Sequence, residues 1–123
     1  MKVLGIIPAR YDSSRFPGKP LIDLKGKTMI HRVYEAASRS QLIDKLIVAT
    51  DDQRIIAEVE SFGGNAMLTK NTHQSGTDRC AEVLSQFPAY ELVINIQGDE
   101  PLVSAEQLDQ LLGAFLDKTV QIA

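Results

Sequence analysis

Residues 3–21 read Val3-Leu4-Gly5-Ile6-Ile7-Pro8-Ala9-Arg10-Tyr11-Asp12-Ser13-Ser14-Arg15-Phe16-Pro17-Gly18-Lys19-Pro20-Leu21. The first five are a continuous apolar run, which is typical of a strand that is covered on both faces of a parallel sheet. A loop follows with three cations, Arg10, Arg15 and Lys19, two serine hydroxyls and a Pro-Gly-Lys-Pro turn. Free backbone N–H groups, guanidinium forks and an ammonium charge are what a phosphate-binding loop needs. The stretch therefore predicts a buried strand that leads into a site for several phosphate groups.

Two common phosphate motifs do not fit this loop. A Walker A loop reads G-x-x-x-x-G-K-[ST], but Ser13 stands where the first glycine belongs and Pro20 stands where Ser or Thr would bind magnesium. Pro20 also lacks an N–H and favours an extended backbone at Lys19. A G-x-G-x-x-G fingerprint is missing from the sequence as well. The loop is therefore expected to bind phosphate through side chains as well as through backbone.

Outward from this stretch, strand and helix patterns alternate. Apolar runs predict further strands at 46–49, 65–69 and 92–96, and a last one beginning at 120–123. Apolar residues at helical spacing predict helices at 28–39, after the capping box Thr50-x-x-Gln53, from Thr77 onward, and after Ser104-x-x-Gln107. Such alternation predicts an α/β fold, a Rossmann-like, mostly parallel sheet with helices on both faces. Because the last strand has no turn after it, we expect the chain to be the N-terminal piece of a longer protein.

Polar clusters follow each of the first four predicted strands. They are the residues 10–19, 50–52, 73–79 and 97–101. Ligands of such sheets bind beyond the carboxyl ends of the strands, so we expect these four clusters to share one edge. Asp99 is a hard oxygen donor of the kind that holds Mg²⁺ together with substrate phosphates.

Each cluster also has an interpretation without function. The basic loop could be a solvated surface loop, and Asp99 or Glu100 could serve the start of a helix. The 73–79 segment could be a polar loop in which Ser75 or Thr77 caps the next helix, and 50–52 is explained mainly by capping. His31 is expected on a solvated helix face and Cys80 in the core. These readings stay open beside the functional ones.

The amino-acid composition indicates a globular protein and argues against several other classes of protein. The 123 residues are 44% hydrophobic and 24% charged with a net charge of −3, so they describe one globular domain without a general attraction to nucleic acid or anionic membrane. A single cysteine excludes an internal disulfide. The apolar N-terminus is too short for a signal peptide, and no run reaches the ~20 apolar residues of a membrane helix. We expect a cytoplasmic protein.

Four sequence blocks, in order, resemble the 3-deoxy-manno-octulosonate cytidylyltransferase (CMP-Kdo synthetase) family. They are Ile7 to Leu21, Ala49-Thr50-Asp51-Asp52, His73-x-Ser75-Gly76-Thr77-Asp78-Arg79, and Asn95-Ile96-Gln97-Gly98-Asp99-Glu100-Pro101-Leu102. The first block alone is similar to sugar nucleotidyltransferases in general, and the last two are the more specific. The resemblance implies that residues 1–123 are the nucleotide-binding part of a single cytidylyltransferase domain whose C-terminal remainder is absent, and that this part alone is inactive.

The resemblance also implies a reaction and its residues. CTP and Kdo would give CMP-Kdo and pyrophosphate with Mg²⁺, for lipopolysaccharide biosynthesis, in an enzyme that is a homodimer at full length. The candidate catalytic residues are Arg10, Lys19 and Asp99, with Asp99 as metal ligand. The candidate nucleotide- and substrate-binding residues are Arg10, Ser13, Arg15, Lys19, Ser75, Gly76, Arg79 and Gln97, of which Gln97 would face the sugar.

Three alternatives remain at this point. One is a cytidylyltransferase of the same architecture that acts on another sugar, such as the acylneuraminate type. Another is a nucleotide-sugar glycosyltransferase, in which an Asp-containing loop after a strand also holds metal. The third is a nucleotide-binding fragment without catalysis.

Overall fold

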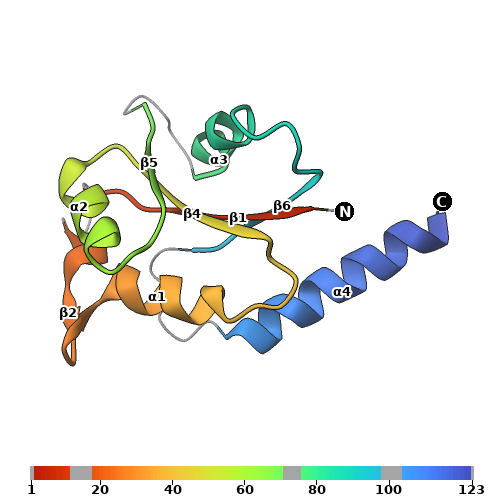
Figure 1. Cartoon of the computed structure of the whole chain (residues 1–123), viewed down its shortest axis with the longest axis horizontal. Helices are drawn as coiled ribbons and strands as arrows, with labels where there is room; N and C mark the ends of the chain where they lie inside the picture. Colours follow the sequence, from red (N-terminus) through yellow and green to blue (C-terminus); the bar gives the residue numbers. More distant parts are fainter. Residues whose placement is uncertain (1, 12–17, 71–75, 98–103, 123) are drawn as a thin grey trace.

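The computed structural model describes residues 2–11, 18–70, 76–97 and 104–122. In this part of the chain four parallel strands form one sheet in the order β5-β4-β1-β6 (Figure 1). The strands are β1 (Val3–Pro8), β4 (Lys45–Thr50), β5 (Ala66–Leu68) and β6 (Leu92–Asn95). The α-helices are α1 (Met29–Ser38), α2 (Gln53–Ser61), α3 (Gly76–Leu84) and α4 (Ala105–Ile122). A short 3-10 helix η1 (Lys19–Leu21) and the hairpin of β2 (Asp23–Leu24) and β3 (Lys27–Thr28) connect β1 to α1.

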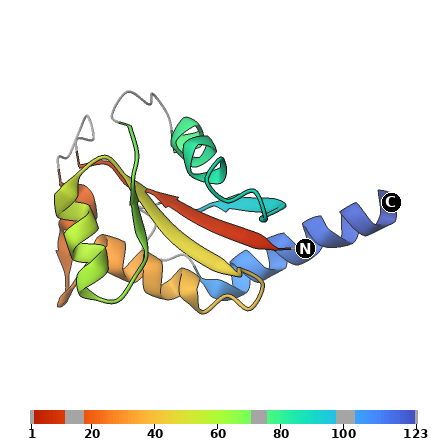
Figure 2. The same ribbon diagram turned by 45° about the horizontal axis from the view of Figure 1, so that its top comes forward.

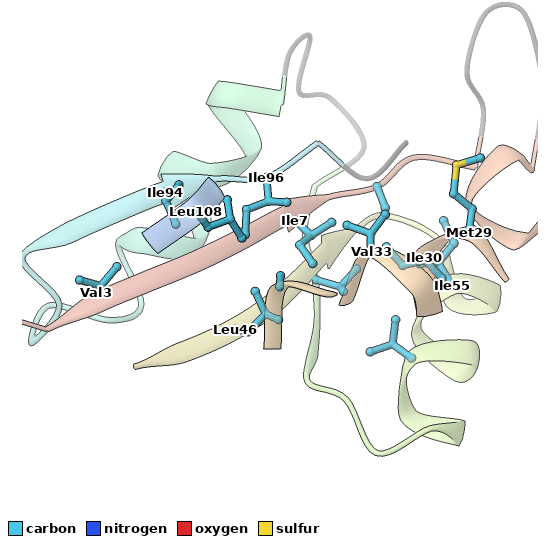
Figure 3. Packing of buried hydrophobic residues seen from close by; sticks show 14 of the residues in the cluster. Val3, Ile7, Met29, Ile30, Val33, Leu46, Ile55, Ile94, Ile96 and Leu108 are labelled. Carbon is cyan, nitrogen blue, oxygen red and sulfur yellow. The ribbon is translucent and has the colours of Figure 1, made fainter. Parts of the chain in front are cut away.

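Helices cover both faces of the sheet, as the alternating pattern predicts (Figure 2). On one face, side chains of β1, β4 and β6 pack with α1, α2 and α4 in a cluster that includes Ile7, Ile30 and Leu108 (Figure 3). On the other face, Leu4 and Ile6 of β1 pack with Cys80 and Val83 of α3. The continuous apolar run of β1 is explained by this two-sided burial. The predicted fold class is therefore confirmed.

Helix starts follow the capping residues, with one correction. Thr28 caps α1 by accepting a hydrogen bond from the His31 N–H at 3.3 Å, and Ser104 accepts from the Gln107 N–H at 3.1 Å at the start of α4. The cap of α2 is Asp52, which accepts from the Arg54 N–H at 2.8 Å, and not the predicted Thr50. Thr50 is still the last residue of β4 and is fully buried, so it cannot begin a helix.

The predicted strand at 120–123 is wrong, because α4 continues through Ile122. Four residues are too few to distinguish a strand from a helix by their pattern, and a helix satisfies its own N–H and C=O groups without a neighbouring strand. The helical spacing also predicts that Ala81 and Leu111 face the core, and both predictions are wrong. Leu111 is 62% exposed on α4, and Val83 rather than Ala81 is buried on α3. Among the described residues, none of the helices combines the length and the apolar composition that a bilayer crossing requires.

Candidate functional site

The carboxyl ends of the four strands meet at one edge of the sheet. Pro8 of β1 is in register with Ala49 of β4, and Thr50 is in register with Leu68 of β5. On the other side of β1, Ile6 is in register with Asn95 of β6. The pairing continues beyond the strands, where the Ala9 N–H donates to the Ala49 carbonyl at 2.9 Å.

This register decides which polar residues are neighbours. The residues that leave the sheet at this edge are Arg10 after β1, Asp51 after β4, Lys70 after β5 and Gln97 after β6. All four strands are parallel, so these four residues leave the sheet at the same edge. We refer to the part of the sheet edge that is marked by Arg10, Asp51, Lys70 and Gln97 as the carboxyl edge. The structure thus brings together the starts of the clusters at 10–19, 50–52 and 97–101, whereas the start of the 73–79 cluster lies outside the described residues.

The described ends of the basic loop lie against each other at this edge. The Gly18 N–H donates to the Tyr11 carbonyl at 2.6 Å, which brings Arg10 and Lys19 to the same turn. Gly18 has a φ of 77°, a left-handed conformation that favours glycine, and Lys19 and Pro20 begin η1 directly after it. Arg10 is exposed. Ser13 and Arg15, the other candidates of this loop, lie outside the described residues.

Tyr11, at this turn, and Arg54, which contacts it from α2, had no functional signal in the sequence. The Arg54 guanidinium lies over the ring of Tyr11, with its Cζ 3.3 Å from the ring centre. Asp52 holds the same guanidinium with two oxygens, at 3.0 Å from Nε and 2.7 Å from Nη2. This hydrogen bonding from the Arg54 side chain lowers the pKa of Asp52 below its usual value. Arg54 was missed because it belongs to α2, and only its place in space links it to the basic loop.

Arg79 of the predicted 73–79 cluster is completely buried. Its guanidinium donates to the Thr69 hydroxyl, to the Lys70 carbonyl at 3.2 Å and to the Asp51 carboxylate at 3.4 Å. Its Nε has no hydrogen-bond partner within the described ranges. In this arrangement Arg79 connects the ends of β4 and β5 to α3 and contacts no solvent. Its predicted role near the nucleotide stays a prediction.

The remaining candidates divide between described and undescribed residues. Gly76 is the first residue of α3, whereas Ser75 lies outside the described residues. Gln97 is exposed beside β1 at the carboxyl edge. Asp99 and Glu100 lie outside the described residues, so the predicted metal ligand stays a prediction. No group of three or more His, Cys, Asp or Glu side chains that could hold a metal occurs within the ranges that the structure describes.

Two residues that were expected to be structural are explained by their packing. Cys80 is buried on the inner face of α3, and burial raises the pKa of its thiol to about 11, so the thiol is neutral at physiological pH. The ring of His31 stacks on Phe62, with ring centres 4.0 Å apart, and its Nε2 lies 3.7 Å from Glu35. His31 is therefore only partly solvated, at 23% side-chain exposure, because the Phe62 ring stacks on one face of its imidazole.

The chain is similar in sequence to known cytidylyltransferases. The family model described as Cytidylyltransferase matches residues 4–122. A relative from Syntrophobacter fumaroxidans named 3-deoxy-manno-octulosonate cytidylyltransferase is 56% identical over 117 residues, which are 94% of this chain and 47% of the relative. One of the same name from Parabacteroides distasonis is 50% identical over 124 residues, covering 100% of this chain and 49% of the relative.

The fold of this chain is also similar to that of a solved structure with a related name. The structure of CMP:2-keto-3-deoxy-manno-octonic acid synthetase complexed with CTP matches with a TM-score of 0.92 and 46% identity. The match covers 95% of this chain and 48% of that protein. The chain thus spans about half the length of the curated relatives that it matches.

Proposed function

This chain belongs to the cytidylyltransferase family, and on this premise we propose that it is the nucleotide-binding part of a CMP-Kdo synthetase. The proposed reaction transfers CMP from CTP to the anomeric hydroxyl of 3-deoxy-D-manno-octulosonate (Kdo) and releases pyrophosphate. The observation that carries the proposal is the carboxyl edge, where Arg10, Lys19 and Gln97 follow strands that are direct neighbours. Relatives of that name are 50% and 56% identical across nearly the whole chain, which supports the choice of substrates.

The chemistry of the reaction suits this set of residues. The anomeric oxygen of Kdo attacks the α-phosphorus of CTP, a new phosphorus–oxygen bond forms, and the bond to the β-phosphate breaks. The electron pair of that bond leaves with pyrophosphate, and the proton of the attacking hydroxyl passes to solvent. Such a transfer depends on positioning and on neutralising charge, and less on covalent catalysis. Arg10 and Lys19 supply positive charge at the carboxyl edge, and we propose that Ser13 and Arg15 also bind the triphosphate.

The same reaction brings two anions together, because Kdo is an acidic sugar and CTP carries a triphosphate. We propose that Gln97 faces the sugar and that Ser75, Gly76 and Arg79 serve the nucleotide, with Arg79 acting from its buried position through the ends of β4 and β5. Asp99 comes two residues after Gln97, and its carboxylate is a hard oxygen donor that fits Mg²⁺. When bound, the metal would neutralise phosphate charge.

The proposal also covers the pathway, the cellular compartment and the oligomeric state of the complete enzyme. CMP-Kdo would serve lipopolysaccharide biosynthesis, in the cytoplasm, with a homodimer as the complete enzyme. Residues 1–123 would bind CTP without turnover, because the chain spans about half of its relatives. An acylneuraminate-type enzyme or a nucleotide-sugar glycosyltransferase would share the fold, but no observation at the carboxyl edge favours either of them.

A hybrid protein tests the proposal. Residues 1–123 are continued by the second half of the Syntrophobacter fumaroxidans relative, which is 56% identical over the matched region. We expect the hybrid to form CMP-Kdo and pyrophosphate from CTP and Kdo, and residues 1–123 alone to bind CTP without product. N-acetylneuraminic acid in place of Kdo, and UDP-sugars in place of CTP, are the matched substrate controls. A folded hybrid that makes no CMP-Kdo, or that prefers neuraminic acid, would contradict the assignment.

A further inference from the structure

We propose that Arg54, a residue of α2, is a positioning residue for the nucleotide. It would act by fixing Tyr11 and, through Tyr11, both ends of the basic loop. We call the group of Tyr11, Asp52 and Arg54 the tyrosine clamp. The inference rests on the proposed function, because it concerns the affinity of that same edge for CTP.

The first observation is the contact between α2 and the end of β1. The Arg54 Cζ lies 3.3 Å from the centre of the Tyr11 ring, well inside the ~6 Å range of a cation–π interaction. Tyr11 directly follows Arg10, and its ring also packs on the large hydrophobic cluster. Fixing this ring therefore fixes the backbone that carries Arg10.

The second observation is that the guanidinium is itself oriented. Asp52 accepts from Nε and Nη2 of Arg54 in the two-pronged geometry that a carboxylate and a guanidinium share. Asp52 is in turn fixed as the cap of α2, where it accepts from the Arg54 N–H at 2.8 Å. The Asp52 side chain is 18% exposed, while that of Arg54 is 58% exposed. The less exposed carboxylate thus anchors the guanidinium plane to the start of α2.

The third observation links the clamp to Lys19. A Cβ on Gly18 would lie only 3.1 Å from Cε2 and 3.3 Å from Cζ of the Tyr11 ring, so glycine allows the chain to pass close to this ring. The Gly18 N–H donates to the Tyr11 carbonyl at 2.6 Å. Lys19 comes next and begins η1. Tyr11 therefore contacts both Arg54 and the turn that sets the position of Lys19.

Arg54 and the two loop cations have different roles in this arrangement. Arg10 and Lys19 contact the phosphates in the proposed function, and Arg54 holds in place the turn that carries both of them. Because positions are held in advance, less conformational freedom is lost when CTP binds. Loss of the clamp should weaken the binding of CTP and leave the binding of Kdo unchanged.

The test uses steady-state kinetics of the hybrid protein. We expect Arg54→Ala to raise KM for CTP by about twofold to fivefold, with KM for Kdo unchanged. Asp52→Asn keeps an N-cap but loses one charged partner, and should raise KM for CTP in the same direction. Tyr11→Phe keeps the ring and should behave like the unsubstituted protein, whereas Tyr11→Leu should match Arg54→Ala. The double variant Tyr11→Leu with Arg54→Ala should be no worse than either single variant.

Arg39→Ala is the matched control, because it removes the same charge from an exposed ion pair with Glu35 at the end of α1. In NMR spectra, Arg54 side-chain protons should be shifted upfield by the Tyr11 ring, and this shift should disappear in Tyr11→Leu. An active hybrid in which Arg54→Ala leaves KM for CTP unchanged, or in which Arg39→Ala raises it equally, would overturn the clamp alone. A folded hybrid that makes no CMP-Kdo would instead overturn the proposed function, and this inference with it.

Discussion

Replacing Arg79 by methionine tests whether the buried guanidinium holds the strand ends together. Arg79 is completely buried and donates to Thr69, to the Lys70 carbonyl and to Asp51. Methionine fills a similar space along the side-chain stem but provides no donor. The carbonyl of Lys70 and the hydroxyl of Thr69 would then be left without this partner.

The expected loss is about 3 kcal/mol in the free energy of unfolding. Removing one member of a buried ion pair costs roughly 3–5 kcal/mol. The Asp51 side chain is 17% exposed, so water partly replaces the lost arginine and the lower end applies. With a denaturant dependence of about 2 kcal/mol per molar urea, the unfolding midpoint should fall by roughly 1.5 M.

Urea unfolding followed by circular dichroism measures this loss. Arg39→Met is the control, because the Arg39 side chain is 68% exposed and its pair with Glu35 at 3.4 Å should contribute at most about 0.5 kcal/mol. The double variant with Asp51→Asn should lose less than the sum of the two single variants, since the two residues share one interaction. If Arg79→Met moved the midpoint no further than Arg39→Met, the structural role assigned to Arg79 would be refuted.

Three further outcomes are expected. In the hybrid protein, Lys19→Met and Asp99→Asn should each lower turnover about a hundredfold, from the ~3 kcal/mol of one well-placed group, and near-normal rates for both would mean that the site is misplaced. Cys80→Ala should leave turnover nearly unchanged, and the native thiol should react slowly with a disulfide reagent at pH 8, because burial raises the pKa of Cys80 to about 11. The hydrogen bond from Ser40 lowers the pKa of Asp109, so its contribution to stability is present above about pH 4 and is lost as the pH falls through the depressed pKa. Asp109→Asn should therefore destabilise by about 1 kcal/mol at pH 7, and urea unfolding should show the difference shrinking toward pH 2.

Strands β1 and β4 were predictable because they are buried on both faces. The apolar runs at β1, β4 and β6 have no polar alternation, and such runs occur where helices cover a parallel sheet. The hairpin of β2 and β3 was not predicted, since strands of two residues are too short to show any period. Its turn has positive φ at Lys25 and Gly26, 58° and 96°, and of these two residues only the glycine favours that conformation.

The candidate site was predictable to the extent that it follows strand ends. Arg10 and Gln97 come directly after apolar runs, and the rule for parallel sheets places such residues at one edge. The pair of Tyr11 and Arg54 could not be predicted in this way, because their contact depends on how α2 packs against the end of β1. Likewise, the sequence could not tell whether Arg79 points to solvent or inward, because that depends on its contacts with β4 and β5.

The central place of β1 has a consequence for how the polypeptide is made. Its first partner, β4, is complete at Thr50, but its second partner begins only at Leu92, about 40 residues later. At a synthesis rate of ~5–20 residues per second, the second edge of β1 waits about 2–8 s on the ribosome with its hydrogen-bonding groups open. Slow codons in this interval would lengthen the wait and expose the nascent chain to aggregation or chaperone binding. Synonymous changes there should alter the yield of native protein without altering a single side chain.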